Sequence, residues 1–196
     1  IIEFKDGVLS DQWPVSLTDA PADIEGLARL SSSRYCLINS AGTVLTFTLN
    51  EDETEATEII RQGVAGSPWS GDSQIESLSI RKLWNQNVAI WATRGNGATP
   101  SRIFFGVVSE GGNVFTANYP TPSTFYSAPW PTPDQRHINA LHIDKAGIVY
   151  ASAATDQGNS GPFSSAIYRI GSFANGSPLP VFTLDGSPTE IYRTTN

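Results

Sequence analysis

Short segments in which apolar and polar residues alternate recur along the whole chain, and turn-forming residues separate them. Residues 43–49, for example, combine Val, Leu, Phe and Thr and follow the turn Ser40-Ala41-Gly42. Segments of this length and composition, bounded by Gly, Asn and Pro, are typical of β-strands. Almost no segment shows the periodicity of an amphipathic helix. The pattern therefore predicts an all-β protein.

The segment Asp23-Ile24-Glu25-Gly26-Leu27 returns three times in altered form. It is followed by Ile75-Glu76-Ser77-Leu78 and Ile138-Asn139-Ala140-Leu141, and more weakly by Thr189-Glu190-Ile191-Tyr192. Positions 25, 76, 139 and 190 lie 51, 63 and 51 residues apart. A period of this size indicates a repeat architecture.

Each full repeat is expected to hold four short strands. In chain order these expected strands are 23–30, 35–39, 43–49 and 56–61; 75–83, 88–93, 102–109 and 113–118; 138–144, 148–153, 165–170 and 179–184. In the first repeat, a short helix over Glu55–Arg61 is an alternative to the fourth strand. Four strands per repeat of about 50 residues fit a blade of a β-propeller better than a β-sandwich.

The first strand of each repeat is expected to line the central axis of the propeller. Small residues at Gly26, Ser77 and Ala140 suit that place, because inner strands crowd together there. We expect one domain over residues 1–196, divided into repeats 23–73, 74–136 and 137–187.

The two ends of the chain are expected to form one abbreviated closing blade. Residues 188–196, with a strand at Glu190 after a turn at 186–188, would join residues 1–22, with short strands at 1–5 and 13–19. The ring would then have about four blades of antiparallel sheet. A fragment of a larger propeller is the alternative.

Composition narrows the classes of partner and compartment. The net charge is −7 and the 12 Lys and Arg residues are scattered, which argues against nucleic acid as a partner. No apolar segment is long enough to insert into a bilayer. The chain lacks Met, so we expect a processed, exported protein, extracellular or periplasmic. The single cysteine, Cys36, lies in an apolar segment and is expected to be buried and inert.

The acidic and amide residues of the repeated motif suggest a metal site. Equivalent places on four inner strands would bring together Glu25, Glu76, Asn139 and Glu190. Carboxylates that converge repel one another unless a cation neutralises them, and oxygen ligands alone favour Ca²⁺ or Mg²⁺. The alternative is that these residues cap strand ends and bind only backbone groups and water.

The blade motifs resemble known families. Asp23-Ile24-Glu25-Gly26-Leu27 resembles the opening of blades in the SdiA-regulated and phytase-like propellers. The spacing of Ile138, Leu141, Asp144, Gly147 and Tyr150 is similar to that of NHL and gluconolactonase-type blades. The resemblance implies a propeller, calcium at the axis, and in some members hydrolysis of phosphate esters or lactones.

Direct support for catalysis is thin. No nucleophile elbow, zinc spacing or phosphate loop is present, and His137 and His142 fit a structural role better than that of a general base. Arg29, Arg81 and Arg193 recur after the motif at irregular offsets. Whether the protein is an enzyme stays open; if it is one, we expect a metal-dependent hydrolase.

Candidate ligand-binding residues lie in segments between strands. The Pro-aromatic segment 118–133 either packs across a blade or forms a binding edge through Tyr126 and Trp130. Two loops contribute polar candidates, namely Arg94, Asn96, Asp156 and Asn159. We therefore expect a secreted propeller that acts as a binding or scaffold module for a protein or carbohydrate, with an axial divalent cation. A calcium-dependent hydrolase of phosphoesters or lactones and a carbohydrate-binding lectin are the alternatives.

Overall fold

The computed structural model describes residues 2–5, 8–12, 15–18, 21–63, 75–93, 103–108, 115–118, 137–154, 164–177 and 179–195. Across these ranges the regular elements are all β-strands, fourteen in number, and no helix occurs. They form three four-stranded antiparallel sheets and one two-stranded sheet. The predicted all-β class is therefore confirmed.

The three four-stranded sheets follow one another along the chain, and their strands pair in sequence order. Sheet 1 holds β3 (Ile24–Arg29), β4 (Arg34–Asn39), β5 (Thr43–Leu49) and β6 (Ala56–Gly63). Sheet 2 holds β7 (Ile75–Leu83), β8 (Gln86–Thr93), β9 (Ile103–Val108) and β10 (Phe115–Asn118). Sheet 3 holds β11 (His137–Ile143), β12 (Ile148–Ala154), β13 (Ser164–Ala174) and β14 (Val181–Thr195).

The predicted strands of the three repeats agree with these elements to within a few residues, with β14 as the exception. The helix considered for Glu55–Arg61 is wrong, because β6 pairs with β5 through the same residues. At the N-terminus, β1 (Ile2–Lys5) pairs with β2 (Val8–Gln12). The sequence pattern predicted β1 but not β2. The strand expected at 13–19 is reduced, in its described part, to a single parallel bridge between Ser16 and Glu55.

The end of the chain differs from the expected closing blade. Residues 181–195 form one strand, β14, which pairs with β13 from Val181 to Leu184 and again from Thr189 to Thr195, while residues 185–188 lie outside the ladder. Irregularities in the β13–β14 register absorb the Gly and Pro residues, and an edge strand tolerates the missing N–H of proline. Glu190 therefore lies opposite Tyr168 on the outermost strand of sheet 3, and not on an inner strand.

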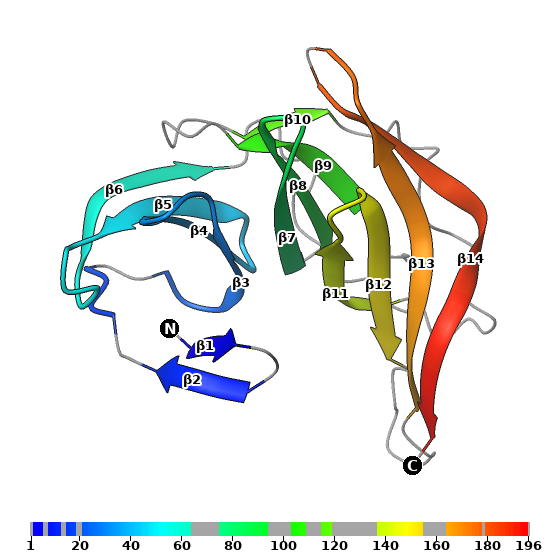
Figure 1. Ribbon diagram of the computed structural model, residues 1–196, viewed down its shortest axis with the longest axis horizontal. Helices are drawn as coiled ribbons and strands as arrows, with labels where there is room; N and C mark the ends of the chain where they lie inside the picture. The colour runs from blue at the N-terminus through cyan, green and yellow to red at the C-terminus, as the bar shows by residue number, and fades with distance from the viewer. Residues whose placement is uncertain are drawn as a thin grey trace.

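The first strands of the three sheets lie next to one another. β7 contacts β3 on one side and β11 on the other, and the sheets spread outward from these three inner strands (Figure 1). The hairpin β1–β2 lies apart, on the open side of sheet 1. Among the described strands the three sheets stay separate, and none pairs with another to close a ring.

Two hydrophobic cores fill the spaces between neighbouring sheets. Between sheets 1 and 2, Ile38 and Cys36 of β4 pack with Trp91 and Leu78 of sheet 2. Between sheets 2 and 3, residues of β8 and β9 pack with Ile138, Leu141 and the β12 and β13 side chains. Successive side chains of a strand point to opposite faces, so β7, β8 and β9 of sheet 2 each contribute to both cores. The β8 segment, buried almost throughout, is apolar for this reason.

The repeat places equivalent residues in unequal surroundings. Leu78 and Leu141 are each 8% exposed between sheets, whereas the equivalent Leu27 of sheet 1 is 49% exposed. The same holds for Ile24, which is 50% exposed although Ile75 and Ile138 are fully buried. Among the described strands, no four-stranded sheet covers the side of sheet 1 that faces away from sheet 2. Val15 and Leu17 pack against the outer part of that face.

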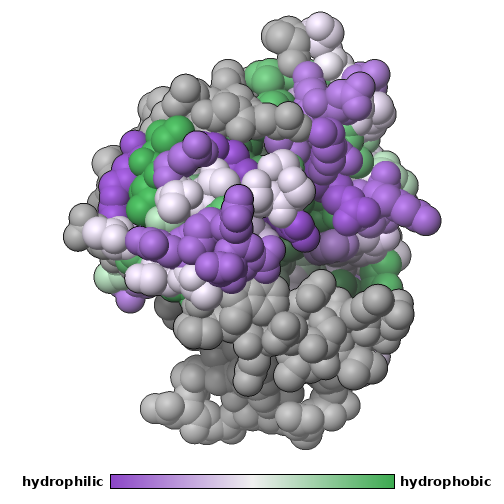
Figure 2. All heavy atoms as spheres, turned by 60° about the vertical axis from the view of Figure 1, so that its left-hand side comes forward, coloured by the Kyte–Doolittle hydropathy of each residue, from purple (hydrophilic) through white to green (hydrophobic). Residues whose placement is uncertain are grey.

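The side of sheet 1 that faces away from the other sheets is mostly polar in its described part. Figure 2, which brings the side of sheet 1 forward, shows mostly hydrophilic side chains across its described part. The exposed turn Glu51-Asp52-Glu53 between β5 and β6 adds three acidic residues to sheet 1. Within the residues that the structure describes, no helix is long and apolar enough to cross a membrane.

Cys36 is buried in the core between sheets 1 and 2, as predicted. Burial raises the pKa of its thiol from 9.0 to about 12. We expect the folded protein to resist iodoacetamide at pH 8, because the thiolate is the reactive form, and to be alkylated fully once urea unfolds it. Mass spectrometry of both samples measures the difference. Rapid alkylation of the folded chain would contradict the buried position.

The same thiol makes stability depend on pH in a defined direction. Its neutral form is favoured in the fold, so its contribution is complete below pH 9. As pH rises from 9 towards about 12, the unfolded chain loses the proton first and the folded state loses stability. Comparing urea unfolding of the protein and Cys36→Ala over this range isolates the contribution.

Candidate functional site

The repeated motif forms the same irregularity in all three sheets. In the pairing of each first strand with the second, the register shifts by one residue, and the extra, bulged residue is Glu25, Glu76 or Asn139. Such a β-bulge re-aims the extra side chain and is common beside functional sites. The sequence repeat thus has a structural basis, with the acidic or amide residue at the bulge and a small residue after it.

The small residue after the first bulge lets β3 approach β7. A Cβ added to Gly26 would lie 2.6 Å from the Cβ and 3.0 Å from the backbone nitrogen of Leu78. Between the next two strands, the Ile143 N–H donates to the Ser79 hydroxyl at 3.1 Å. Asp23, which opens the first motif, has a φ of 56°, a conformation that Asp tolerates better than most residues. These residues therefore have structural reasons to be what they are.

The structure brings together three of the four predicted metal ligands and leaves out the fourth. Glu25, Glu76 and Asn139 occupy equivalent bulges on neighbouring strands, while Glu190 lies on β14. Calcium takes six to eight oxygen ligands. In the described part of the chain, no group of three or more His, Cys, Asp or Glu side chains is placed to hold a metal. The predicted four-residue set is not assembled, and calcium binding stays a prediction.

An open hollow of about 680 Å³ crosses the three inner strands. Two tiers of equivalent residues line it, first Leu27, Leu78 and Leu141, then Ala28, Ser79 and His142. The remaining lining residues are Arg29, Ile80, Arg81 and Lys82. Because each strand contributes the same positions, the hollow follows directly from the alignment of the repeats.

The lining of the hollow is basic although the protein is acidic. Among the described residues, the lining includes Arg29, Arg81 and Lys82 and no carboxylate, in a chain of net charge −7. The Arg29 guanidinium is held in place, because its Nε donates to the Ser31 carbonyl at 2.9 Å and Nη2 donates to that of Ser32. It also lies 5.9 Å from the centre of the Tyr35 ring. A side chain that is already held in place loses less conformational entropy when it binds an anion.

His142 adds a titratable side chain at the same hollow. Its ring lies 6.5 Å from that of Tyr150, whose hydroxyl donates to Asp144 at 3.4 Å. Burial alone would raise the pKa of Asp144, but N–H groups of Ile148 and Ala146, the Tyr150 hydroxyl and nearby His142 together hold it below its usual value. Asp144 therefore stays ionised at neutral pH and closes the turn into β12.

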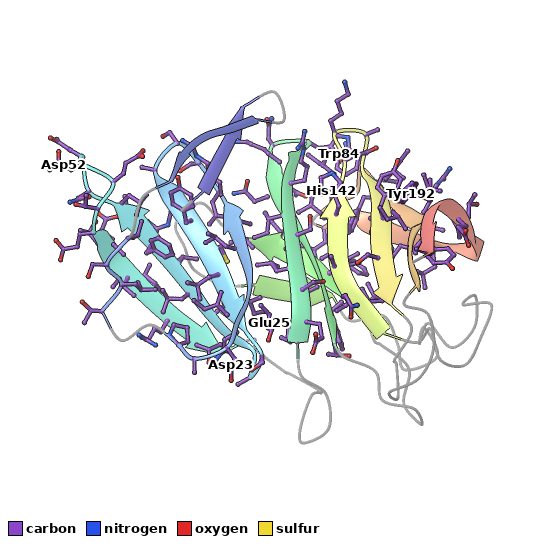
Figure 3. The ribbon with its side chains drawn as sticks, turned by 90° about the horizontal axis from the view of Figure 1, so that it is seen from below. Asp23, Glu25, Asp52, Trp84, His142 and Tyr192 are labelled. Atoms are coloured by element: carbon purple, nitrogen blue, oxygen red, sulfur yellow. The ribbon has the colours of Figure 1, made fainter. Side chains whose placement is uncertain are left out.

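Acidic and basic residues of the inner strands lie towards different ends, with Asp144, beside His142 just after β11, as the exception. The bulged Glu25 and the preceding Asp23 lie at one end of these strands, while His142 and Trp84 lie towards the other (Figure 3). Arg29, Arg81 and Lys82 follow the motif in sequence and lie at the hollow. The inner strands therefore favour an anion at the end with the basic hollow and a cation at the end with Glu25 and Asp23.

The loop residues predicted to bind ligand lie outside the described residues. These are Arg94, Asn96, Tyr126, Trp130, Asp156 and Asn159. The sequence pattern did not predict the hollow. The recurrence of Arg29 and Arg81 was its one signal, and their unequal offsets hid it. Arg193, the third of that series, lies on β14, away from the inner strands.

Comparison with known proteins adds no relative. The chain matches no protein-family model, no curated protein and no solved structure at a significant level.

Proposed function

We propose that this protein is a β-propeller-type binding module whose inner strands carry the ligand surface. Three features support the propeller: four antiparallel strands per sheet, paired in sequence order, with the first strand of each sheet against its neighbours. A propeller blade has this construction, and ligands of propellers bind near the central channel that the first strands line. The exposed Leu27 and Ile24 fit a ring that needs further sheets to close.

We infer that the ligand is a small organic anion. The observation that carries this inference is the basic, carboxylate-free hollow across β3, β7 and β11. An anionic group there gains charge-assisted hydrogen bonds, while the leucine tier contacts an apolar part of the same molecule. Binding of this kind requires no catalytic group, and the binding module remains the favoured function over a hydrolase.

Titration of the protein with citrate and with inorganic phosphate, at low and moderate salt, tests the anion site. We expect the affinity to fall as the salt concentration rises. Arg81→Gln should lower the affinity roughly tenfold or more, because a hydrogen bond to a charged group is lost. Isothermal titration calorimetry measures both effects. Removal of divalent metal with a chelating resin should leave the affinity unchanged, since the proposed contacts come from side chains and not from a metal.

Arg61→Gln is the matched control for the Arg81 variant. Arg61 is an exposed arginine on β6, the outermost strand of sheet 1, and it does not line the hollow. Equal weakening by both variants would show that only the net charge matters, and the proposed site would be wrong. Loss of binding after treatment with a chelating resin, restored by added Ca²⁺, would favour the calcium hypothesis instead.

A further inference from the structure

Trp84 occupies a backbone position that rarely accepts a large residue. Leu83 pairs with Gln86 across the β7–β8 hairpin, so Trp84 and Asn85 alone form the turn. Their φ angles of 48° and 62° are both left-handed, as in a type I′ turn. That turn favours Asn and Gly, and a bulky residue there is an outlier. Asn85 fits its place, whereas Trp84 has no conformational reason to be there.

The indole of Trp84 is also unusually open to solvent. It is 40% exposed, whereas Trp91, the other tryptophan in the described part of the chain, is fully buried and stacks on Phe104. An exposed aromatic in a strained turn gains little for the fold. Strained positions of this kind cluster at ligand contacts and active sites.

Trp84 lies close in sequence to the basic hollow, although it is not one of the residues that line it. It follows Arg81 and Lys82 by three and two residues, so its Cα lies roughly 7–10 Å from theirs along the strand direction. Figure 3 shows Trp84 and His142 towards the same end of the inner strands. An aromatic face and several cations therefore lie within about the length of one sugar ring and its substituents.

We propose that Trp84 stacks on the ring of an acidic sugar, a hexuronate, whose carboxylate binds at Arg81 and Lys82. This inference rests on the proposed anion-binding function and names its ligand class. A pyranose ring presents C–H groups that pack on an indole face, and a carboxylate accepts bidentate hydrogen bonds from arginine. A neutral sugar would leave the cations unused, and a simple anion would leave the indole exposed.

An acidic sugar fits this surface better than a membrane does. Exposed Trp beside Lys and Arg also occurs at membrane interfaces. The net charge of −7 opposes approach to an anionic lipid surface, whereas a small ligand responds mainly to the charges within a Debye length of about 10 Å.

Calorimetric titration with oligogalacturonate tests the proposal. We expect the protein to bind it, and its methyl-esterified form, which keeps the rings and loses the charge, to bind at least tenfold more weakly. Trp84→Asn suits the left-handed turn and removes the aromatic face, and should weaken binding roughly two- to tenfold. Trp84→Tyr, which restores an aromatic face, should recover most of the affinity. Thermal melting checks that both variants are folded.

The outcomes separate this proposal from the anion site on which it rests. If Trp84→Asn binds like the unaltered protein while Arg81→Gln binds more weakly, the stacking proposal is wrong and the anion site stands. If the unaltered protein binds neither oligogalacturonate nor citrate, both are wrong. Co-sedimentation with phosphatidylserine vesicles that Trp84→Asn abolishes, without oligogalacturonate binding, would assign Trp84 to a membrane and also overturn the proposal.

Discussion

Replacing Leu78 with alanine should lower the free energy of unfolding by about 2–5 kcal/mol, and replacing Leu141 should have a similar effect. Both side chains are 8% exposed and lie in the cores between neighbouring sheets. The loss combines the removed apolar contacts with the cavity left behind, which packed neighbours fill only in part. Urea unfolding of each variant measures the change.

Leu27→Ala is the matched control, because the repeat gives Leu27 the equivalent place in sheet 1. It is 49% exposed, so we expect its replacement to cost less than about 1 kcal/mol. The three variants share one chemical change on three equivalent strands and differ only in the neighbouring sheet. Equal costs at all three positions would mean that Leu27 is covered in solution, for instance by another chain.

Gly26→Ala should destabilise the protein by about 1–3 kcal/mol, although alanine normally favours an ordered strand over glycine. The added methyl group would lie 2.6 Å from the Leu78 Cβ and 3.0 Å from its backbone nitrogen, so β3 and β7 must move apart. Gly186→Ala provides the control, because no atom lies within 4 Å of the Cβ that it adds. That change should be neutral or slightly stabilising.

A double variant identifies the cause of the Gly26 effect. The crowded atom of Leu78 is its Cβ, which alanine retains. The cost of Gly26→Ala should therefore persist in the Leu78→Ala background, and the two changes should add to within about 0.5 kcal/mol. If Leu78→Ala removed most of the cost, the outer part of the leucine side chain would be responsible. The close backbone approach of β3 and β7 would then not explain the need for glycine at position 26.

These variants also show how the fold prepares the candidate site. The bulges at Glu25, Glu76 and Asn139 and the small residues after them bring the inner strands side by side. The positions that follow in each strand then line one hollow. A change that moves β3 away from β7 should weaken anion binding together with stability, whereas Arg81→Gln should weaken binding alone.

The sequence by itself determined the strands and the repeat. Alternation, turn residues and the recurring motif predicted most strands of the three sheets, because these signals are local and the strands are short. It also determined that Cys36 is buried, since the cysteine lies within an apolar segment. The sequence also predicted that Glu25, Glu76 and Asn139 occupy equivalent places on the first strands, and the bulges lie there.

Only the tertiary structure decided how the ends and the site are arranged. The Gly-Ser-Pro signal before Glu190 marks an interruption of the ladder within β14 and not a turn into a separate strand, because the residues on both sides of it pair with β13, and no local pattern records that pairing. Arg29 and Arg81 have different offsets from the motif, so their shared hollow appears only when the strands are placed side by side. Equivalent leucines likewise have one sequence pattern and two environments, because burial depends on the neighbouring sheet and not on the strand itself.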